Sequence, residues 1–227
     1  AGDYFPDVYV SCNVGDYLVL PESIDVVYNV RSQNKKQSVS WNETQMKAID
    51  TTKVGSYEIE GTLEDGTTVT AHVEVEMVNY AVNPGFEDKN RSMWNVSYEG
   101  DADPTDYQVK ADDAHSGETA VHFWSGDSDM EFSIEQEVTG LENGTYQLSV
   151  FSQGGDMPSD ASMELYAVTA DGGQTAPFML TTYNDWQNPT IKEIKVTDGT
   201  GKIGVRFQCN VGSWGTVDDF TLNRISD

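Results

Sequence analysis

Basic residues are scarce in this sequence. Its 227 residues include 13 Lys and Arg against 38 Asp and Glu, which gives a formal net charge of -25 at pH 7. Nucleic-acid-binding proteins need clustered Lys and Arg to displace counterions from phosphates, so that class is excluded. Anionic membranes and anionic polysaccharides are disfavoured by the same repulsion. Neutral sugars and metal cations remain compatible partners, and the acidity also favours solubility.

Cysteine, histidine and long apolar runs are also few. Cys12 and Cys209 fall in different predicted domains, so a disulfide between them is disfavoured, but the sequence does not decide it. The three dispersed histidines and two separated cysteines do not form a zinc-site pattern. No apolar run is long enough to span a membrane as a helix. Ala1-Gly2-Asp3 does not begin a signal peptide, so we expect a mature chain or a fragment.

What the sequence does contain is short alternating strands separated by turns rich in Gly, Asn and Asp. Val, Thr and Tyr are abundant, and long helical periodicity is absent, so we predict an all-β protein. Alternation stops near Val78, and Asn83-Pro84-Gly85 then provides strong turn chemistry. We therefore predict two domains, residues 1–78 and 79–227.

The first domain is predicted to be a small β-sandwich. Strands are expected over Ile24–Val30, Ser38–Trp41, Gly55–Leu63 and Thr68–Val75, with an Asp-Gly hairpin turn at Glu64–Thr67. Leu20-Pro21, Val39-Ser40-Trp41, Gly55-Ser56-Tyr57 and Ala71–Val75 together resemble bacterial immunoglobulin-like domains, over about residues 16–78. Trp41 is expected to belong to the core.

The second domain is predicted to be a two-sheet jelly roll. Its strand candidates are Ala120–Trp124, Phe132–Val138, Tyr146–Ser152, Ser162–Val168, Ile191–Val196, Lys202–Gln208 and Thr216–Leu222. Alternation predicts that the core includes Phe123, Leu148, Val150, Leu165, Val205 and Phe207.

Side chains on the opposite side of these strands combine flat aromatics with hydrogen-bonding groups. They are His122, Trp124, Ser149, Phe151, Gln153, Glu164, Tyr166, Arg206 and Gln208. Aromatic rings stack on pyranose C–H patches, and amides and guanidinium groups recognise hydroxyls, so we expect a neutral-sugar groove. Trp186 and Trp214 would extend it from loops. Ligand contact is favoured for Trp124 and Trp214, and packing for Trp94 and Trp186.

Two short motifs bracket the second domain. Asn83-Pro84-Gly85-Phe86-Glu87 opens it and Val217-Asp218-Asp219-Phe220 closes it. Alternation places Asp218 on an apolar face, where a carboxylate is costly unless it is paired or metal-bound, and it points Asp219 outward. Calcium binds carboxylates together with turn carbonyls, so Glu87 and Asp218 are candidate ligands. The alternative is that Glu87 and Asp219 are solvated surface acids.

These motifs and the turn His115-Ser116-Gly117 resemble galactose- and glucan-binding β-sandwich modules. That resemblance implies a structural calcium held by Glu87, the Ser116 carbonyl region and Asp218.

Further motifs resemble the family 61 carbohydrate-binding modules over nearly all of residues 80–225. They are Tyr107–Lys110, His115–Gly117, His122–Ser125, Gln153–Asp156, Asp185–Pro189 and Ser213–Phe220. The resemblance implies binding of β-1,4-galactan beside a secreted endo-β-1,4-galactanase on the same parent chain. It also implies galactose contacts from Gln153, Asp156, Arg206 and Trp214.

Two other functions remain open from the sequence. A small jelly-roll glycosidase or lyase would need paired carboxylates across a cleft, and with 38 acids some pair always fits. A ligand-free adhesion or spacer fragment would bind no glycan. No Ser-His-Asp context, phosphate-binding loop or metalloprotease motif occurs, so we expect no catalytic residues and a binding module.

Overall fold

The computed structural model describes residues 7–28 and 34–227 and is built almost wholly of β-strands. It contains two compact units, residues 1–78 and 79–227. Residues 29–30 of the predicted strand Ile24–Val30, and Ala1-Gly2-Asp3, lie outside the described ranges. Within those ranges, no helix combines the length and apolar character needed to cross a membrane.

The smaller unit is one five-stranded sheet with the order β1-β5-β4-β3-β2. Its elements are β1 (Val8–Asn13), β2 (Ser23–Val26), β3 (Lys35–Trp41), α1 (Glu43–Lys47), β4 (Gly55–Leu63) and β5 (Thr68–Glu76). The predicted hairpin joins β4 to β5, with Gly66 at φ +87°. Trp41 packs on the core and donates from Nε1 to the Pro21 carbonyl at 2.8 Å, which satisfies its buried polar end.

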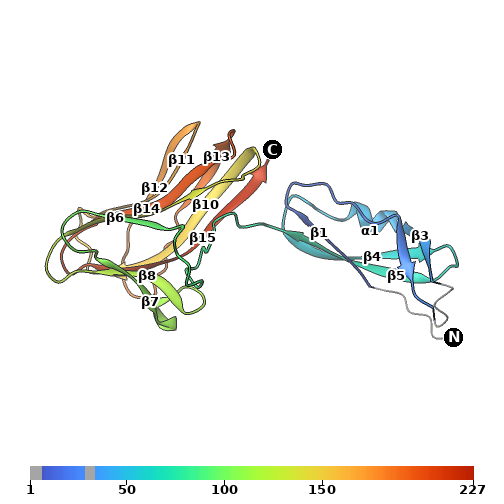
Figure 1. Ribbon diagram of the computed structural model, residues 1–227, viewed down its shortest axis with the longest axis horizontal. Helices are drawn as coiled ribbons and strands as arrows, with labels where there is room; N and C mark the ends of the chain where they lie inside the picture. The colour runs from blue at the N-terminus through green and yellow to red at the C-terminus, as the bar shows by residue number, and fades with distance from the viewer. Residues whose placement is uncertain (1–6, 29–33) are drawn as a thin grey trace. The chain divides into compact units, whose positions relative to one another are not determined.

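The larger unit is a sandwich of two five-stranded sheets, seen as two layers in Figure 1. The sheet with the order β13-β10-β15-β8-β7 is called the β15 sheet, and the sheet with the order β12-β11-β14-β9-β6 is called the β14 sheet. The β15 sheet contains β7 (Thr105–Val109), β8 (Thr119–Trp124), β10 (Gly144–Gly155), β13 (Thr190–Val196) and β15 (Trp214–Ser226). The β14 sheet contains β6 (Asn95–Tyr98), β9 (Met130–Val138), β11 (Ser162–Thr169), β12 (Gly172–Phe178) and β14 (Gly201–Cys209). A short 3-10 helix, η2, spans Ala111–Asp113.

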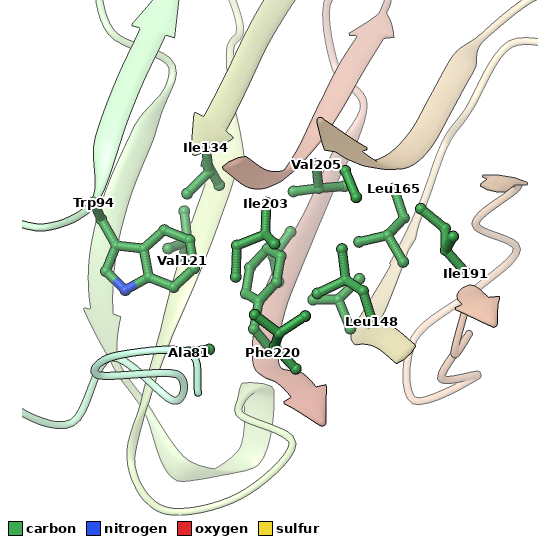
Figure 2. Packing of buried hydrophobic residues seen from close by; sticks show 14 of the residues in the cluster. Ala81, Trp94, Val121, Ile134, Leu148, Leu165, Ile191, Ile203, Val205 and Phe220 are labelled. Carbon is green, nitrogen blue, oxygen red and sulfur yellow. The ribbon is translucent and has the colours of Figure 1, made fainter. Parts of the chain in front are cut away.

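The core of the larger unit lies between its two sheets. Figure 2 shows Ile134, Leu165, Ile203 and Val205 of the β14 sheet packed with Val121, Leu148 and Phe220 of the β15 sheet. The six predicted core residues, from Phe123 to Phe207, are each at most 1% exposed. Both cysteines are free thiols. Burial first, then the Asp129 charge, raises the pKa of Cys209 to about 11, although a hydrogen bond with Ser213 lowers it.

The sequence did not predict four of the strands, β1, β6, β7 and β12. The β12 segment Gly172–Phe178 has no apolar alternation and contains Pro177, which fits an edge strand that leaves one side unpaired. The β1 strand is held by parallel pairing with β5, a long-range contact that its local pattern does not indicate.

Candidate functional site

An exposed aromatic surface lies on the outer face of the β15 sheet. Trp214 of β15 pairs directly with Trp124 of β8, so the two indoles project on the same side of the sheet. Trp124 is 54% exposed, and Tyr183 from the loop before β13 is 45% exposed. The Tyr183 ring centroid lies 6.4 Å from that of Trp214. We call Trp124, Trp214 and Tyr183 the aromatic platform.

Trp214 is held in place by the end of β10. Its Nε1 donates to Asp156 Oδ2 at 2.9 Å, and Ser213 Oγ donates to the Asp156 carbonyl at 3.0 Å. Gly155 pairs with Trp214 across the strands, and a Cβ there would lie 2.8 Å from the indole Cζ2. Asp156, predicted from the resemblance to contact galactose, therefore orients the indole in this structure.

Gln153 is buried beneath the same surface, at 1% exposed. Its Nε2 donates to Thr216 Oγ1 at 2.8 Å, and its Oε1 accepts from the Asn184 N–H at 3.1 Å. Thr216 Oγ1 donates to the Asp113 carbonyl at 2.8 Å. Gln153 thus ties together the loops beside the platform, and its amide is not presented to solvent.

Trp186 packs against the turn between η2 and β8. Its ring lies edge-on to His115 at a centroid distance of 5.1 Å, and His115 stacks on Phe151 at 3.6 Å. Trp186 therefore packs against other aromatic side chains at the margin of the site.

The sequence did not single out Tyr183 or Asp106. Tyr183 is on a loop without alternation, and its Oη donates to the Asp112 carbonyl at 3.0 Å. Asp106 lies on the unpredicted strand β7, where its Oδ1 is 2.8 Å from His122 Nδ1. Only the cross-strand register of β7 and β8 places this polar pair beside Trp124.

The remaining predicted sugar contacts do not join the platform. Tyr166 is on β11, and Arg206 and Gln208 are on β14, so all three face outward from the other sheet. The single predicted groove is therefore divided between opposite faces of the sandwich. Alternation determines the side of a strand on which a residue lies, but it does not determine the sheet that the strand joins.

Asp218 is a fully buried carboxylate beneath the turn at residues 115–119. Its Oδ2 accepts from the N–H groups of His115 and Ser116 at 2.9 and 3.3 Å, and its Oδ1 accepts from that of Asp219 at 2.8 Å. Burial first, then the Asp219 charge, raises the pKa of Asp218 to about 8 despite these three donors.

Asp219 contacts the same turn as Asp218, although alternation predicted the two side chains on opposite sides of the strand. The pairing of β10 with β15 shifts between Ser149 and Phe151, and Asp219 has φ +53°, which breaks the alternation. Its Oδ1 accepts from Ser116 Oγ at 2.9 Å, and its Oδ2 lies 2.7 Å from His115 Nδ1.

Glu87 holds the other half of the turn. Its Oε1 accepts from the N–H groups of Glu118 and Thr119 at 2.8 and 2.9 Å. Gly117 has φ +62°, and a Cβ there would lie 2.1 Å from that same oxygen, so only glycine fits this close approach.

The three acids meet around Gly85 of the opening motif. A Cβ on Gly85 would lie 3.0 Å from Asp219 Oδ1, 3.7 Å from Asp218 Oδ1 and 3.9 Å from Glu87 Cγ. Within residues 7–28 and 34–227, however, no three His, Cys, Asp or Glu side chains form a group able to hold a metal. A cation here would have to draw on turn carbonyls as well as carboxylates, and calcium accepts such a mixed set of oxygens.

Comparison with solved structures identifies the family. The structure of TmCBM61 in complex with β-1,4-galactotriose matches with 33% sequence identity and a TM-score of 0.59, covering 65% of this chain and 99% of that one. The chain belongs to the family 61 carbohydrate-binding modules. It is a non-catalytic module, and its larger unit has the β-sandwich fold that the sequence predicted.

Other comparisons concern the smaller unit and more distant sandwiches. Residues 5–67 match the bacterial Ig-like domain (group 4) model, which confirms the predicted immunoglobulin-like part. Module 2 of the family 16 carbohydrate-binding modules matches with 17% identity and a TM-score of 0.45, covering 63% of this chain and 99% of that chain. The CBM22-1 xylan-binding domain of Paenibacillus barcinonensis Xyn10C matches with 11% identity and a TM-score of 0.43, covering 67% and 96%.

Because Asp218 is buried, we expect the thermal stability of this family 61 module to depend on pH when a chelator keeps metal ions away. The folded-state pKa of about 8 lies above the usual value of 3.8, so the folded state binds a proton more tightly than the unfolded state. The contribution of Asp218 to stability is then present below pH 4 and declines as pH rises towards 8. Thermal unfolding in EDTA at pH 5 to 8 should show a steeper fall in Tm for the parent than for Asp218→Asn. Parallel pH curves for the two proteins would contradict this assignment.

Proposed function

We propose that this family 61 module binds β-1,4-galactan on its aromatic platform. The observation that carries the proposal is the direct cross-strand pair of Trp124 and Trp214, two partly exposed indoles on one face. Aromatic rings with exposed faces can stack on the apolar C–H patches of pyranose rings. The family member TmCBM61 was solved with β-1,4-galactotriose, which favours galactan among neutral polysaccharides.

Polar groups beside the platform are suited to recognising sugar hydroxyls. His122 and Asp106 lie next to Trp124 on the same face, and the Asp106 side chain is 61% exposed. Asp156 Oδ2 accepts from Trp214, so Asp156 acts on the ligand by orienting the indole. The platform therefore combines stacking surfaces with hydroxyl-binding groups, as a site for an uncharged polysaccharide requires.

Binding is tested by isothermal titration of the whole chain against β-1,4-galactan, xylan, arabinan and a β-glucan. We expect saturable binding to galactan with micromolar to millimolar affinity, about -8 to -4 kcal/mol, and weaker binding to the others. Binding of xylan or β-glucan in preference to galactan would contradict the proposed specificity. Binding to none of the four would support a ligand-free spacer instead.

The biological role of such binding would be to hold an attached catalytic domain at its substrate. We propose that the module is part of a secreted glycoside hydrolase. An endo-β-1,4-galactanase is the enzyme whose substrate is the proposed ligand of the module. Fusion of the chain to such an enzyme should raise activity on insoluble galactan while leaving activity on soluble galacto-oligosaccharides unchanged. Equal stimulation on both substrates would contradict a targeting role.

Calcium is the second part of the proposal, with a structural role away from the sugar. Glu87 and Asp218 would supply carboxylate oxygens and the turn at Ser116 would supply carbonyl oxygens. The support is the fully buried Asp218 carboxylate, which accepts from the backbone N–H groups of His115, Ser116 and Asp219. A divalent cation at the turn would favour the ionised form of this group.

Removing calcium should lower thermal stability without abolishing galactan binding. At a calcium concentration 100-fold above Kd, binding contributes about 2.7 kcal/mol, or roughly 5 to 10 °C in Tm for a domain of this size. The measurement is differential scanning calorimetry in calcium and in EDTA, with magnesium as the control ion. Identical Tm values in calcium and in EDTA would exclude a stabilising calcium.

A further inference from the structure

The outer face of the β14 sheet carries a groove that is separate from the aromatic platform. Its cavity volume is about 510 Å³, within the range of roughly 300–1,000 Å³ usual for ligand sites. A second cavity of about 450 Å³ adjoins it and shares Glu99, Glu131 and Gln208 with it. On β14 the lining runs from Lys202 to Gln208, a span of about 20 Å at the usual strand rise. The groove is therefore elongated, with the shape of a site for a chain.

The floor of this groove contains a fixed aromatic and guanidinium stack. Gly204 pairs with Tyr166 across β14 and β11, and a Cβ on Gly204 would lie 2.6 Å from the Tyr166 Cζ. The absence of that Cβ lets the ring lie close over the backbone. The Arg206 Cζ sits 4.2 Å from the ring centroid, and Arg206 Nε is 2.8 Å from Glu164 Oε1. Stacking and the ion pair together fix the guanidinium.

The fixed guanidinium retains donors for a ligand. The ion pair of Arg206 with Glu164 is made through Nε, and the Arg206 side chain is 50% exposed, so the guanidinium is open to solvent. Ser133 pairs with Arg206 across β9, and Gln208 is exposed two residues further along β14. A guanidinium, a hydroxyl and an amide on one face are groups that bind hydroxyls.

The charges around the groove exclude an anionic ligand. Glu99, Glu131 and Glu135 outnumber Lys202 and Arg206 in the lining, and the whole chain has a net charge of -25. The polar side chains also make it unsuited to an apolar ligand. An uncharged, hydroxyl-rich chain is the ligand that matches both the shape and the chemistry.

We propose that this groove is a second glycan-binding site, which holds an internal run of a neutral hexopyranose chain through Arg206 and Gln208. The module then carries glycan sites on opposite faces and can bind two chains, or two parts of one chain, at once. The choice of β-1,4-galactan as the probe rests on the proposed function of the platform. Two linked sites raise avidity on a polysaccharide when its geometry allows both to be occupied.

The test is a titration of the whole chain with β-1,4-galactotriose, using calorimetry together with saturation-transfer NMR at millimolar ligand. Four proteins are compared: the parent, the platform variant Trp124→Ala/Trp214→Ala, the groove variant Arg206→Ala/Gln208→Ala, and the combined variant. Lys192→Ala, which removes an exposed positive charge from β13, is the matched control. Thermal unfolding of each protein verifies the fold.

We expect the platform variant to retain binding at one site per chain, and the combined variant to bind that ligand at least tenfold more weakly. The Lys192→Ala control should match the parent. A platform variant without residual binding, or a combined variant that binds as the platform variant does, would overturn the groove site. If the platform variant binds like the parent while the groove variant loses binding, the groove stands and the platform proposal fails. A parent that does not bind galactotriose would overturn both.

Discussion

Replacing both Trp124 and Trp214 by alanine should weaken the binding of β-1,4-galactan roughly 30-fold. Each lost ring stack is expected to remove at least about 1 kcal/mol, and every 1.4 kcal/mol is tenfold in Kd. The two residues face one ligand surface because β8 and β15 pair them directly. Each single variant should weaken binding about fivefold, since one indole then remains.

Affinity electrophoresis in galactan-containing gels and calorimetry of the polysaccharide measure this effect. Tyr9→Ala is a suitable control, because Tyr9 is an aromatic residue that is 74% exposed but lies in the smaller unit. Its retardation in the gel should equal that of the parent. Undiminished binding by both tryptophan variants would show that the platform is not the galactan site.

Replacing Phe220 by alanine should destabilise the larger unit by about 3 to 5 kcal/mol, the usual loss for a buried phenylalanine. Phe220 is fully buried, and its ring lies 4.7 Å from that of Trp94 and 6.3 Å from that of Phe86, between centroids. Its N–H also donates to the Pro84 carbonyl at 3.0 Å. The Phe220 side chain therefore packs the closing motif against the opening motif, and its removal would leave a cavity between the two motifs.

Urea unfolding followed by tryptophan fluorescence measures this loss. Phe220→Leu, which keeps most of the volume, should lose less than about 1.5 kcal/mol. Tyr98→Ala, at a position 42% exposed, should change stability by no more than about 0.5 kcal/mol. A Phe220→Ala variant as stable as Tyr98→Ala would show that the two motifs are held together by other contacts.

The two bracketing motifs show how far sequence reasoning reaches. Alternation predicted Asp218 on the same side of β15 as Phe220, and that prediction is wrong although both are fully buried. Phe220 packs in the core between the sheets, whereas Asp218 pairs with Phe151 on the face that the turn at residues 115–119 covers. The cause is the irregular pairing of β10 with β15 together with the positive φ of Asp219, which reverses the alternation between Asp218 and Phe220. A β-bulge depends on the partner strand, so a single strand's pattern does not reveal it.

The sequence by itself determined the all-β class, the family and the core positions. These follow from local alternation, turn residues and motifs, which act over a few neighbouring residues. Only the tertiary structure decided which surfaces these residues share. Trp124 and Trp214 meet because β8 pairs with β15, whereas Tyr166 and Arg206 face away on the β14 sheet. Strand pairing joins segments far apart in the chain, and burial of both apolar faces against each other sets which sheet each strand enters.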